Sequence, residues 1–217
     1  MLGLNGLRDG DPVPLSVQVG DIGGGGLQPA VAILGALIGV MRGGEGTWID
    51  ASMTDGAASW LALAFAARAG GETVARGDQR LAGRYPCYRV YACKDGGYYS
   101  VGALEPKFWA ALCGALQRPD LVEQQYSEAD ATQDAVEKIF LSRTRAEWEE
   151  VLAPLDACCE PVLDIDEVAS HPQIVARRVL TKAVGQAPGL GEHTAEVLAE
   201  IGVDAGRLEE LRHAGAA

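Results

Sequence analysis

Basic residues are scarce in this 217-residue chain. It has 18 lysines and arginines against 30 aspartates and glutamates, which gives a formal charge of −12 and a pI near 4.6. Because contacts with phosphate groups need a basic face, this balance argues against a nucleic-acid partner and against an anionic membrane surface. Hydrophobic residues make up 48% of the chain and charged residues 22%, which is typical of a folded globular protein rather than a disordered one.

The sequence also lacks the cysteine spacing of a zinc site and the start of an export signal. Its five cysteines include the adjacent pair Cys158 and Cys159, and no Cys-x-x-Cys occurs. The N-terminus has no basic start followed by an apolar run. The longest apolar stretch, Leu27 to Met41, has 15 residues, which is too short to span a bilayer. We therefore predict reduced thiols, no membrane span and a cytoplasmic location.

Histidines are few, and motifs that would hold a cofactor are missing. None of the three histidines, His171, His193 and His213, is flanked by a carboxylate at metal-ligand spacing. The Gly-x-Ser-x-Gly elbow of many serine hydrolases is absent. The glycine run at 23–26 is not the Gly-x-Gly-x-x-Gly of a dinucleotide-binding turn. We therefore expect neither a metal nor a resident cofactor.

The first third of the chain predicts part of an α/β layer. Apolar residues recur at helical spacing over 27–41, and alanine and glycine fill most other positions, so we expect a helix that is buried on nearly every side. Glycines at 43–46 end it. Residues 47–52 predict a short strand, and residues 55–68 an alanine-rich helix. Strand and helix in alternation are typical of an α/β fold.

From Cys87 onward the pattern predicts a smaller α+β domain. Asp95-Gly96 between two aromatic and β-branched runs predicts a β-hairpin, and Pro106 a helix start. Thr144-x-x-Glu147 is a capping-box pattern, and two closing helices are expected over 192–202 and 204–214. Residues 120–167 hold 14 acidic and three basic residues. This favours a solvated helical face over a docking surface.

Two carboxylates are candidates for chemistry. Asp21 comes just before a glycine run and a helix, where the positive end of the helix dipole would stabilise its anion. The glycines would let a substrate approach the backbone, and their N–H groups could hold an oxyanion. Glu105 lies between a strand end and a helix start. By these patterns alone Asp21 is equally a helix-capping aspartate, and Glu105 an ordinary first-turn acid. The glycines concerned are Gly23, Gly24, Gly25 and Gly26.

An ordered set of motifs resembles the CaiB/BaiF, or family III, CoA-transferases, which include the α-methylacyl-CoA racemases. The set runs in the family's order from about residue 20 to the C-terminus. It consists of Gly20-Asp21-Ile22-Gly23-Gly24-Gly25-Gly26-Leu27, Trp48-Ile-Asp50-Ala-Ser-Met53-Thr-Asp-Gly56, Pro86-Cys-Tyr88-Arg-Val-Tyr91 with Asp95-Gly96, Val101-Gly-Ala-Leu-Glu105-Pro-Lys-Phe108-Trp109, and Leu190-Gly-Glu-His-Thr194.

The resemblance implies an enzyme that acts on an acyl-CoA thioester and a carboxylic acid in an interlocked homodimer, with no cofactor besides the CoA of the substrate. In the transferases the aspartate at the place of Asp21 attacks the acyl-CoA carbonyl. In the racemases it is one acid/base at the α-carbon and a histidine is the other, and the glutamate at the place of Glu105 orients that histidine. Having one glycine in residues 81–86, together with Glu105, favours the racemase-like branch.

The resemblance also implies a domain arrangement and a gap. We expect a remnant of the family's large α/β domain over residues 1–75, a smaller α+β domain over 76–185, and C-terminal helices over 186–217 that return to the large domain. Family members carry a long α/β segment before the glycine motif, and here 19 residues precede Gly20. The racemase histidine would lie in that segment. We therefore expect the chain by itself to bind CoA poorly and not to catalyse. A complementing N-terminal chain, or a non-catalytic fragment, is the alternative to a self-sufficient enzyme.

Overall fold

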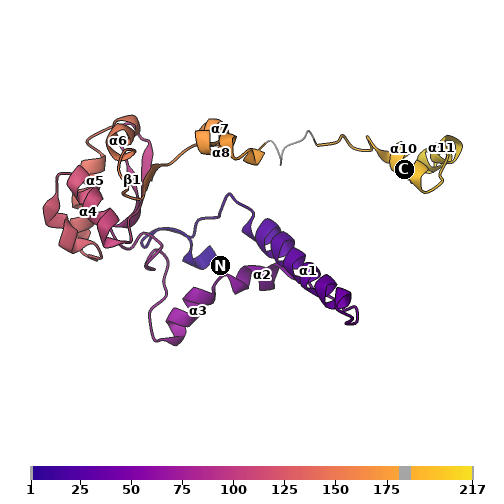
Figure 1. The fold of residues 1–217 in the computed structure, drawn as a ribbon, viewed down its shortest axis with the longest axis horizontal. Helices are drawn as coiled ribbons and strands as arrows, with labels where there is room; N and C mark the ends of the chain where they lie inside the picture. The colour runs from indigo at the N-terminus through magenta and orange to yellow at the C-terminus, as the bar shows by residue number, and fades with distance from the viewer. Residues whose placement is uncertain (1, 181–186, 217) are drawn as a thin grey trace. The chain divides into compact units, whose positions relative to one another are not determined.

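The computed structural model describes residues 2–180 and 187–216, and it divides into two compact units, Met1–Val162 and Leu163–Ala217. Figure 1 shows the elements of both, coloured along the chain. Each unit is described by itself below. The predicted boundary between residues 185 and 186 lies outside the described residues, and the predicted boundary near residue 75 stays a prediction.

The hairpin predicted after Cys87 is confirmed and forms two strands of a three-stranded antiparallel sheet in the order β1-β2-β3, with β2 in the centre. Tyr91 of β1 pairs with Tyr99 of β2, and Val101 of β2 pairs with Cys159 of β3. Gly96 adopts a φ of +83° in the turn, which is a conformation that glycine reaches at little cost. The strands are β1 Tyr88–Ala92, β2 Tyr98–Gly102 and β3 Cys159–Pro161.

Helices gather beside this sheet (Figure 1). Together with the sheet they enclose an aromatic core. Phe140 stacks on Tyr91 with ring centroids 4.9 Å apart and contacts Trp148 at 5.1 Å. The indole N–H of Trp109 donates to the Leu121 carbonyl at 2.9 Å, so this buried polar group is satisfied. The helix predicted from Pro106 is confirmed. The helical elements are α4 Pro106–Ala115, η3 Pro119–Gln124, α5 Asp130–Phe140 and α6 Arg145–Leu152.

The acidic region at 120–167 belongs largely to these outer helices, and none of its carboxylates is buried. The predicted capping box is present, since the Thr144 hydroxyl accepts from the Glu147 N–H and the Glu147 carboxylate accepts from the Thr144 N–H. A second capping box joins Asp164 and Glu167. Several acids therefore serve helix starts, which agrees with a solvated face.

The N-terminal elements correct three predictions. The helix over 27–41 has no buried residue, so the expectation of burial on nearly every side is wrong for this chain. Residues 47–52 form no strand, because a strand needs a hydrogen-bonded neighbour and none of the described strands lies beside them. The helix expected over 55–68 is two helices separated at Trp60 and Leu61. The elements are η1 Leu2–Leu4, η2 Val19–Leu27, α1 Gln28–Met41, α2 Met53–Ser59 and α3 Ala62–Ala69.

The length of the apolar helix also differs from the expectation. The π-helix η2 continues directly into α1, so one helix of 23 residues runs from Val19 to Met41, and an 18-residue window within it has a mean hydropathy of 1.6. The 15-residue estimate was too short because the glycine run is itself helical. By length and composition this helix could cross a membrane, and a core helix of a soluble protein meets the same two criteria.

The second unit confirms the two closing helices, which are shorter than expected. Leu208 of α11 is buried, and Asp204 caps that helix by accepting from the Arg207 N–H at 2.8 Å. The return of these helices to the large domain stays a prediction. The elements are α7 Ile165–Ser170, α8 Pro172–Ala176, α10 Thr194–Glu200 and α11 Ala205–His213.

Candidate active site

Asp21 lies in the first turn of η2 and is exposed to solvent. The aligned amide dipoles of a helix give its N-terminal turn a partial positive charge. The sequence placed Asp21 before the helix, and the structure places it inside the first turn. A nine-residue π-helix is unusual, and π-helical turns are found frequently at functional sites.

The glycines that follow Asp21 allow η2 to lie directly against α2. A Cβ at Gly24 would stand 2.7 Å from the Met53 carbonyl oxygen, and a Cβ at Gly56 would stand 2.5 Å from the Gly24 Cα. A Cβ at Gly23 would overlap the Trp60 ring, so no side chain fits there without a shift. Helix–helix contact through backbone therefore requires glycine on both sides. This explains why two of the sequence motifs, far apart in the chain, share small residues.

This packing changes how the glycines can meet a substrate. Gly23 and Gly24 are buried, whereas Gly26 is exposed. In a π-helix each N–H bonds the carbonyl five residues earlier, as the Gln28 N–H does with the Gly23 carbonyl. The amide groups of Gly24, Gly25 and Gly26 are thus part of the helix's own bonding. A substrate that approaches this turn would meet the Gly26 surface and the side chain of Asp21.

Glu105 is exposed and occupies the N-cap position of α4, but its side chain makes no capping hydrogen bond. Its carbonyl accepts from the N–H groups of Phe108 and Trp109 at 3.0 and 3.2 Å. The backbone of Glu105 is therefore fixed by the helix start while its carboxylate stays available. The negative charge of Glu105 acts on the thiol of Cys158. Desolvation is the largest cause that raises the pKa of Cys158, and the Glu105 carboxylate is the second.

No hydrogen bond or ion pair joins Asp21 to Glu105 within residues 2–180 and 187–216. The three histidines all belong to the second unit. His171 caps α8 with its Nδ1, which accepts from the Gln173 N–H at 3.3 Å, and the Nδ1 of His213 lies 2.8 Å from the Glu209 carbonyl oxygen. No cluster of three metal-ligating side chains occurs among the described residues.

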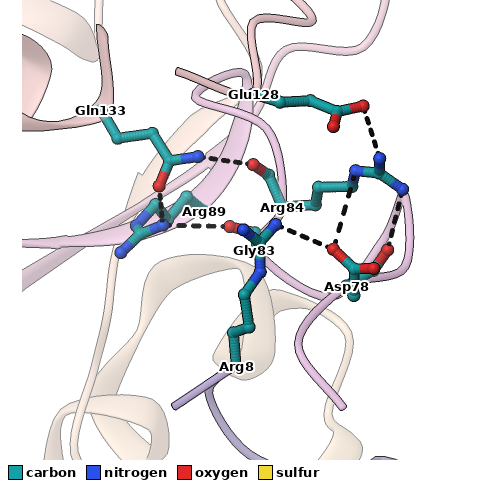
Figure 2. Close-up of polar contacts among 7 residues, drawn as sticks. All are labelled: Arg8, Asp78, Gly83, Arg84, Arg89, Glu128 and Gln133. Carbon is teal, nitrogen blue, oxygen red and sulfur yellow. Dashed lines mark hydrogen bonds and ion pairs between the residues drawn. The ribbon is translucent and has the colours of Figure 1, made fainter. Parts of the chain in front are cut away.

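A set of charged residues that sequence reasoning missed fixes the loop before β1. Asp78 lies between two guanidinium groups, with its Oδ1 2.8 Å from Nη2 of Arg8 and 3.8 Å from Nε of Arg84 (Figure 2). Arg84 also pairs with Glu128, and this hydrogen bond raises the pKa of Arg84. The Gln133 side chain donates to the Arg84 carbonyl. These partners lie up to 70 residues apart in sequence, so no local pattern could have identified them.

Comparison with known proteins identifies the family. The family model described as CoA-transferase family III matches residues 1–202. The chain belongs to this family. It is 30% identical to an alpha-methylacyl-CoA racemase of Mus musculus over 94% of this chain and 60% of that protein. It is 24% identical to a formyl-CoA:oxalate CoA-transferase of Rhodopseudomonas palustris, over 97% of this chain and 62% of that protein.

Solved structures agree on the fold of this family III chain. A CaiB/BaiF family protein from Brucella suis superimposes with a TM-score of 0.70 at 24% identity, over 92% of this chain and 59% of that one. The predicted fold class is thereby confirmed, with helices and a small antiparallel sheet as its visible parts. The chain spans about 60% of the length of the curated relatives just named.

Proposed function

We propose that this protein acts on acyl-CoA thioesters, with Asp21 as the group that reacts with the substrate. The observation that carries the proposal is the exposed Asp21 carboxylate in the first turn of a π-helix, within the glycine motif that resembles the family's signature. A CaiB/baiF CoA-transferase family protein of Caenorhabditis elegans, whose name gives no substrate, is 34% identical to this chain. Two alpha-methylacyl-CoA racemases are 30% and 31% identical to it, and several transferases whose names give their substrates are 24 to 28% identical. This supports racemase-like proton transfer as the first choice.

In racemase-like chemistry, Asp21 takes the α-proton of the thioester or returns it to the opposite face. The proton passes to a carboxylate oxygen, and the electron pair of the C–H bond moves into the enolate, whose oxyanion needs stabilisation. Glu105, whose carboxylate the helix start does not use, would orient the second acid/base.

The second candidate is CoA transfer. Here a carboxylate oxygen of Asp21 attacks the thioester carbonyl, the C–S bond breaks, and CoA leaves as a thiolate while a mixed anhydride forms on Asp21. Attack by CoA thiolate on the aspartyl carbonyl then releases the first carboxylate and leaves an aspartyl-CoA thioester. A second carboxylate attacks this thioester, which expels CoA thiolate and forms a new mixed anhydride. CoA thiolate then attacks the acyl carbonyl of the second acid, which gives the new acyl-CoA and frees the Asp21 carboxylate. The transferase relatives favour this reaction.

We further propose that the catalytic unit contains more polypeptide than these 217 residues, supplied by an interlocked partner subunit or by a complementing chain. Large apolar side chains of α1, of α3 and of the loop between α1 and α2 are exposed, with Met41 85%, Trp48 93% and Leu63 80% accessible. Apolar surface of this extent in a folded protein marks an interface. We expect the chain by itself to bind CoA poorly, to be inactive and to associate. A non-catalytic fragment of such an enzyme is the alternative.

All five cysteines are unpaired, which supports a cytoplasmic location.

The test is substrate α-proton exchange in deuterated water, with a 2-methylacyl-CoA, for the 217-residue chain and for the same chain with any in-frame upstream coding sequence restored. Asp21→Asn should lower exchange by two to four powers of ten, on the order expected for loss of a general base. Asp55→Asn changes a similar exposed first-turn acid of α2 and should leave the rate unchanged. Transfer of CoA to a free carboxylic acid without α-exchange would select the second candidate. Neither reaction in either protein would reject the proposed activity.

A further inference from the structure

The segment that leads into Glu105 is held by a buried amide from another part of the chain. Gln125 is 8% exposed, and its Nε2 donates to the carbonyls of Ala103 and Leu104 at 3.0 and 2.9 Å. Both hydrogens of one side-chain amide are thus bound to consecutive carbonyls. A buried donor and two partly enclosed acceptors would lose their partners together if this side chain were removed.

The next residue binds the same carbonyl from the outside. The Tyr126 hydroxyl donates to the Leu104 carbonyl at 2.6 Å and accepts from Nη2 of Arg80 at 3.2 Å. The Arg80 guanidinium also lies over the Tyr126 ring, 5.2 Å from its centroid, and Tyr85 meets that ring edge-on at 5.4 Å. Gln125 and Tyr126, which directly follow η3, both donate to the Leu104 carbonyl. Arg80, from the loop before β1, reaches the same place through its hydrogen bond to the Tyr126 hydroxyl.

These contacts act on the short link between β2 and α4. The strand ends at Gly102, and α4 begins at Pro106, so three residues set the direction in which the Glu105 side chain leaves the backbone. The carbonyls of the first two are bound by Gln125 and Tyr126, and the carbonyl of the third accepts the first helical hydrogen bonds. Each of the three backbone carbonyls of the link therefore accepts a hydrogen bond. The Glu105 carboxylate, in contrast, makes no capping hydrogen bond to α4.

We propose that Gln125 and Tyr126 are positioning residues that fix the direction of the Glu105 carboxylate, with Arg80 tying the loop before β1 to the same point. This inference rests on the proposed function for its catalytic consequence. Preorganised supporting groups of this kind keep a reactive side chain in place without touching the substrate. Gln125 carries the larger share, because it is buried and supplies two of the three bonds to the link.

The first test measures the link itself and needs no activity. Gln125→Leu keeps the size of the side chain and removes both donors. Gln124→Leu is the matched control, because that neighbouring amide bonds Asp120 and Thr132 rather than the link. Hydrogen exchange followed by mass spectrometry should show roughly tenfold faster exchange for residues 104–109 in Gln125→Leu only. Equal exchange in the two variants overturns the inference.

The second test measures the consequence for the reaction, in whichever form of the protein shows α-proton exchange. Gln125→Leu should lower kcat about tenfold with KM unchanged, by analogy with the loss of other orienting groups. Tyr126→Phe should lower kcat less, and exposed Tyr98→Phe should not change it. In a Glu105→Gln background, Gln125→Leu should have no further effect, because the group it positions is gone.

The two ways to fail are distinct. If Gln125→Leu lowers kcat equally with and without Glu105, the residue is only structural and the inference is wrong. If the wild-type protein shows no substrate chemistry in either form, the proposed function fails, while the exchange of residues 104–109 still decides whether Gln125 holds the link.

Discussion

The sheet with its helices and the N-terminal helices solve the same packing problem in opposite ways. In the sheet region, large rings interdigitate, and Tyr91, Tyr99, Trp109 and Phe140 are almost fully buried. In the N-terminal region, contact is made by bare backbone, where Gly24 meets Gly56. The apolar side chains there point to solvent instead, and α1 buries none of them.

This difference shows which region builds its own hydrophobic core. A core of interlocking side chains removes apolar surface from water within one chain. A glycine contact brings two helices close but leaves their apolar side chains exposed. The proposed partner subunit or complementing chain would cover these side chains in the region of Asp21, whereas Glu105 lies beside a core that this chain builds itself.

The largest expected difference between the two regions is the loss of stability when one side chain is truncated in each. Phe140→Ala removes a ring that contacts Tyr91 and Trp148 and should lower the free energy of unfolding by about 3–5 kcal/mol. Leu37→Ala removes a side chain that is 53% exposed on α1, and its effect should stay within about 0.5 kcal/mol. Urea denaturation followed by tryptophan fluorescence and far-ultraviolet circular dichroism measures both.

A large loss of stability in Leu37→Ala would show that α1 is already covered in solution, for example by association of the chain with itself. The concentration dependence of the unfolding midpoint separates that explanation from a core within one chain.

Two glycine-to-alanine substitutions, one at the contact between η2 and α2 and one away from it, test whether backbone contact holds these helices together. Gly56→Ala places a Cβ against the Gly24 backbone, which cannot move as a flexible side chain would, and overpacking of this kind costs about 1–3 kcal/mol. Gly35→Ala lies in α1 with open space around its Cβ and should instead stabilise the helix by about 0.5–1 kcal/mol. Hydrogen exchange in η2 and α2 should rise in the first variant only. The free energy of unfolding should fall in Gly56→Ala and rise in Gly35→Ala. A fall in both variants would contradict the contact geometry.

Local signals in the sequence predicted the sheet region well. Asp95-Gly96 fixed the hairpin turn, Pro106 began α4, and Thr144 with Glu147 formed the capping box, because each depends on residues a few positions apart. The strand expected at 47–52 was wrong because strand formation depends on a distant partner that composition does not reveal.

The candidate site was only partly visible in the sequence. Asp21 and Glu105 were found through motifs that resemble a family, since patterns alone made them ordinary helix-start acids. The residues that hold Glu105 were not found, because Gln125 lies 22 residues from Ala103 and has no motif of its own. The packing of η2 on α2 through these glycines was not predicted, since it depends on which helix lies opposite, and their role in substrate binding stays a prediction.

The smallest expected effect concerns the one exposed thiol of the sheet region. Four cysteines are buried, and burial raises the pKa of Cys87 and Cys113 to about 11 and that of Cys159 to about 12. Native iodoacetamide labelling near pH 8 should therefore modify Cys158 first, because only a thiolate reacts. All five thiols should react after denaturation without reductant.

Glu105→Gln should speed this labelling of Cys158 a few-fold, because the pKa of that thiol is raised by burial and then by the carboxylates of Glu105 and Asp156, while Lys107 opposes them. With one negative charge removed, the pKa falls and the thiolate fraction at a given pH rises. The midpoint of the rate against pH should move down, and 1 M salt should shrink the difference because exposed charges are screened. Glu123→Gln changes an exposed acid that does not act on the thiol and should leave the rate unchanged. Identical pH profiles in the wild-type and Glu105→Gln proteins would mean that the Glu105 carboxylate does not face Cys158, and the direction assigned to it at the start of α4 would be wrong.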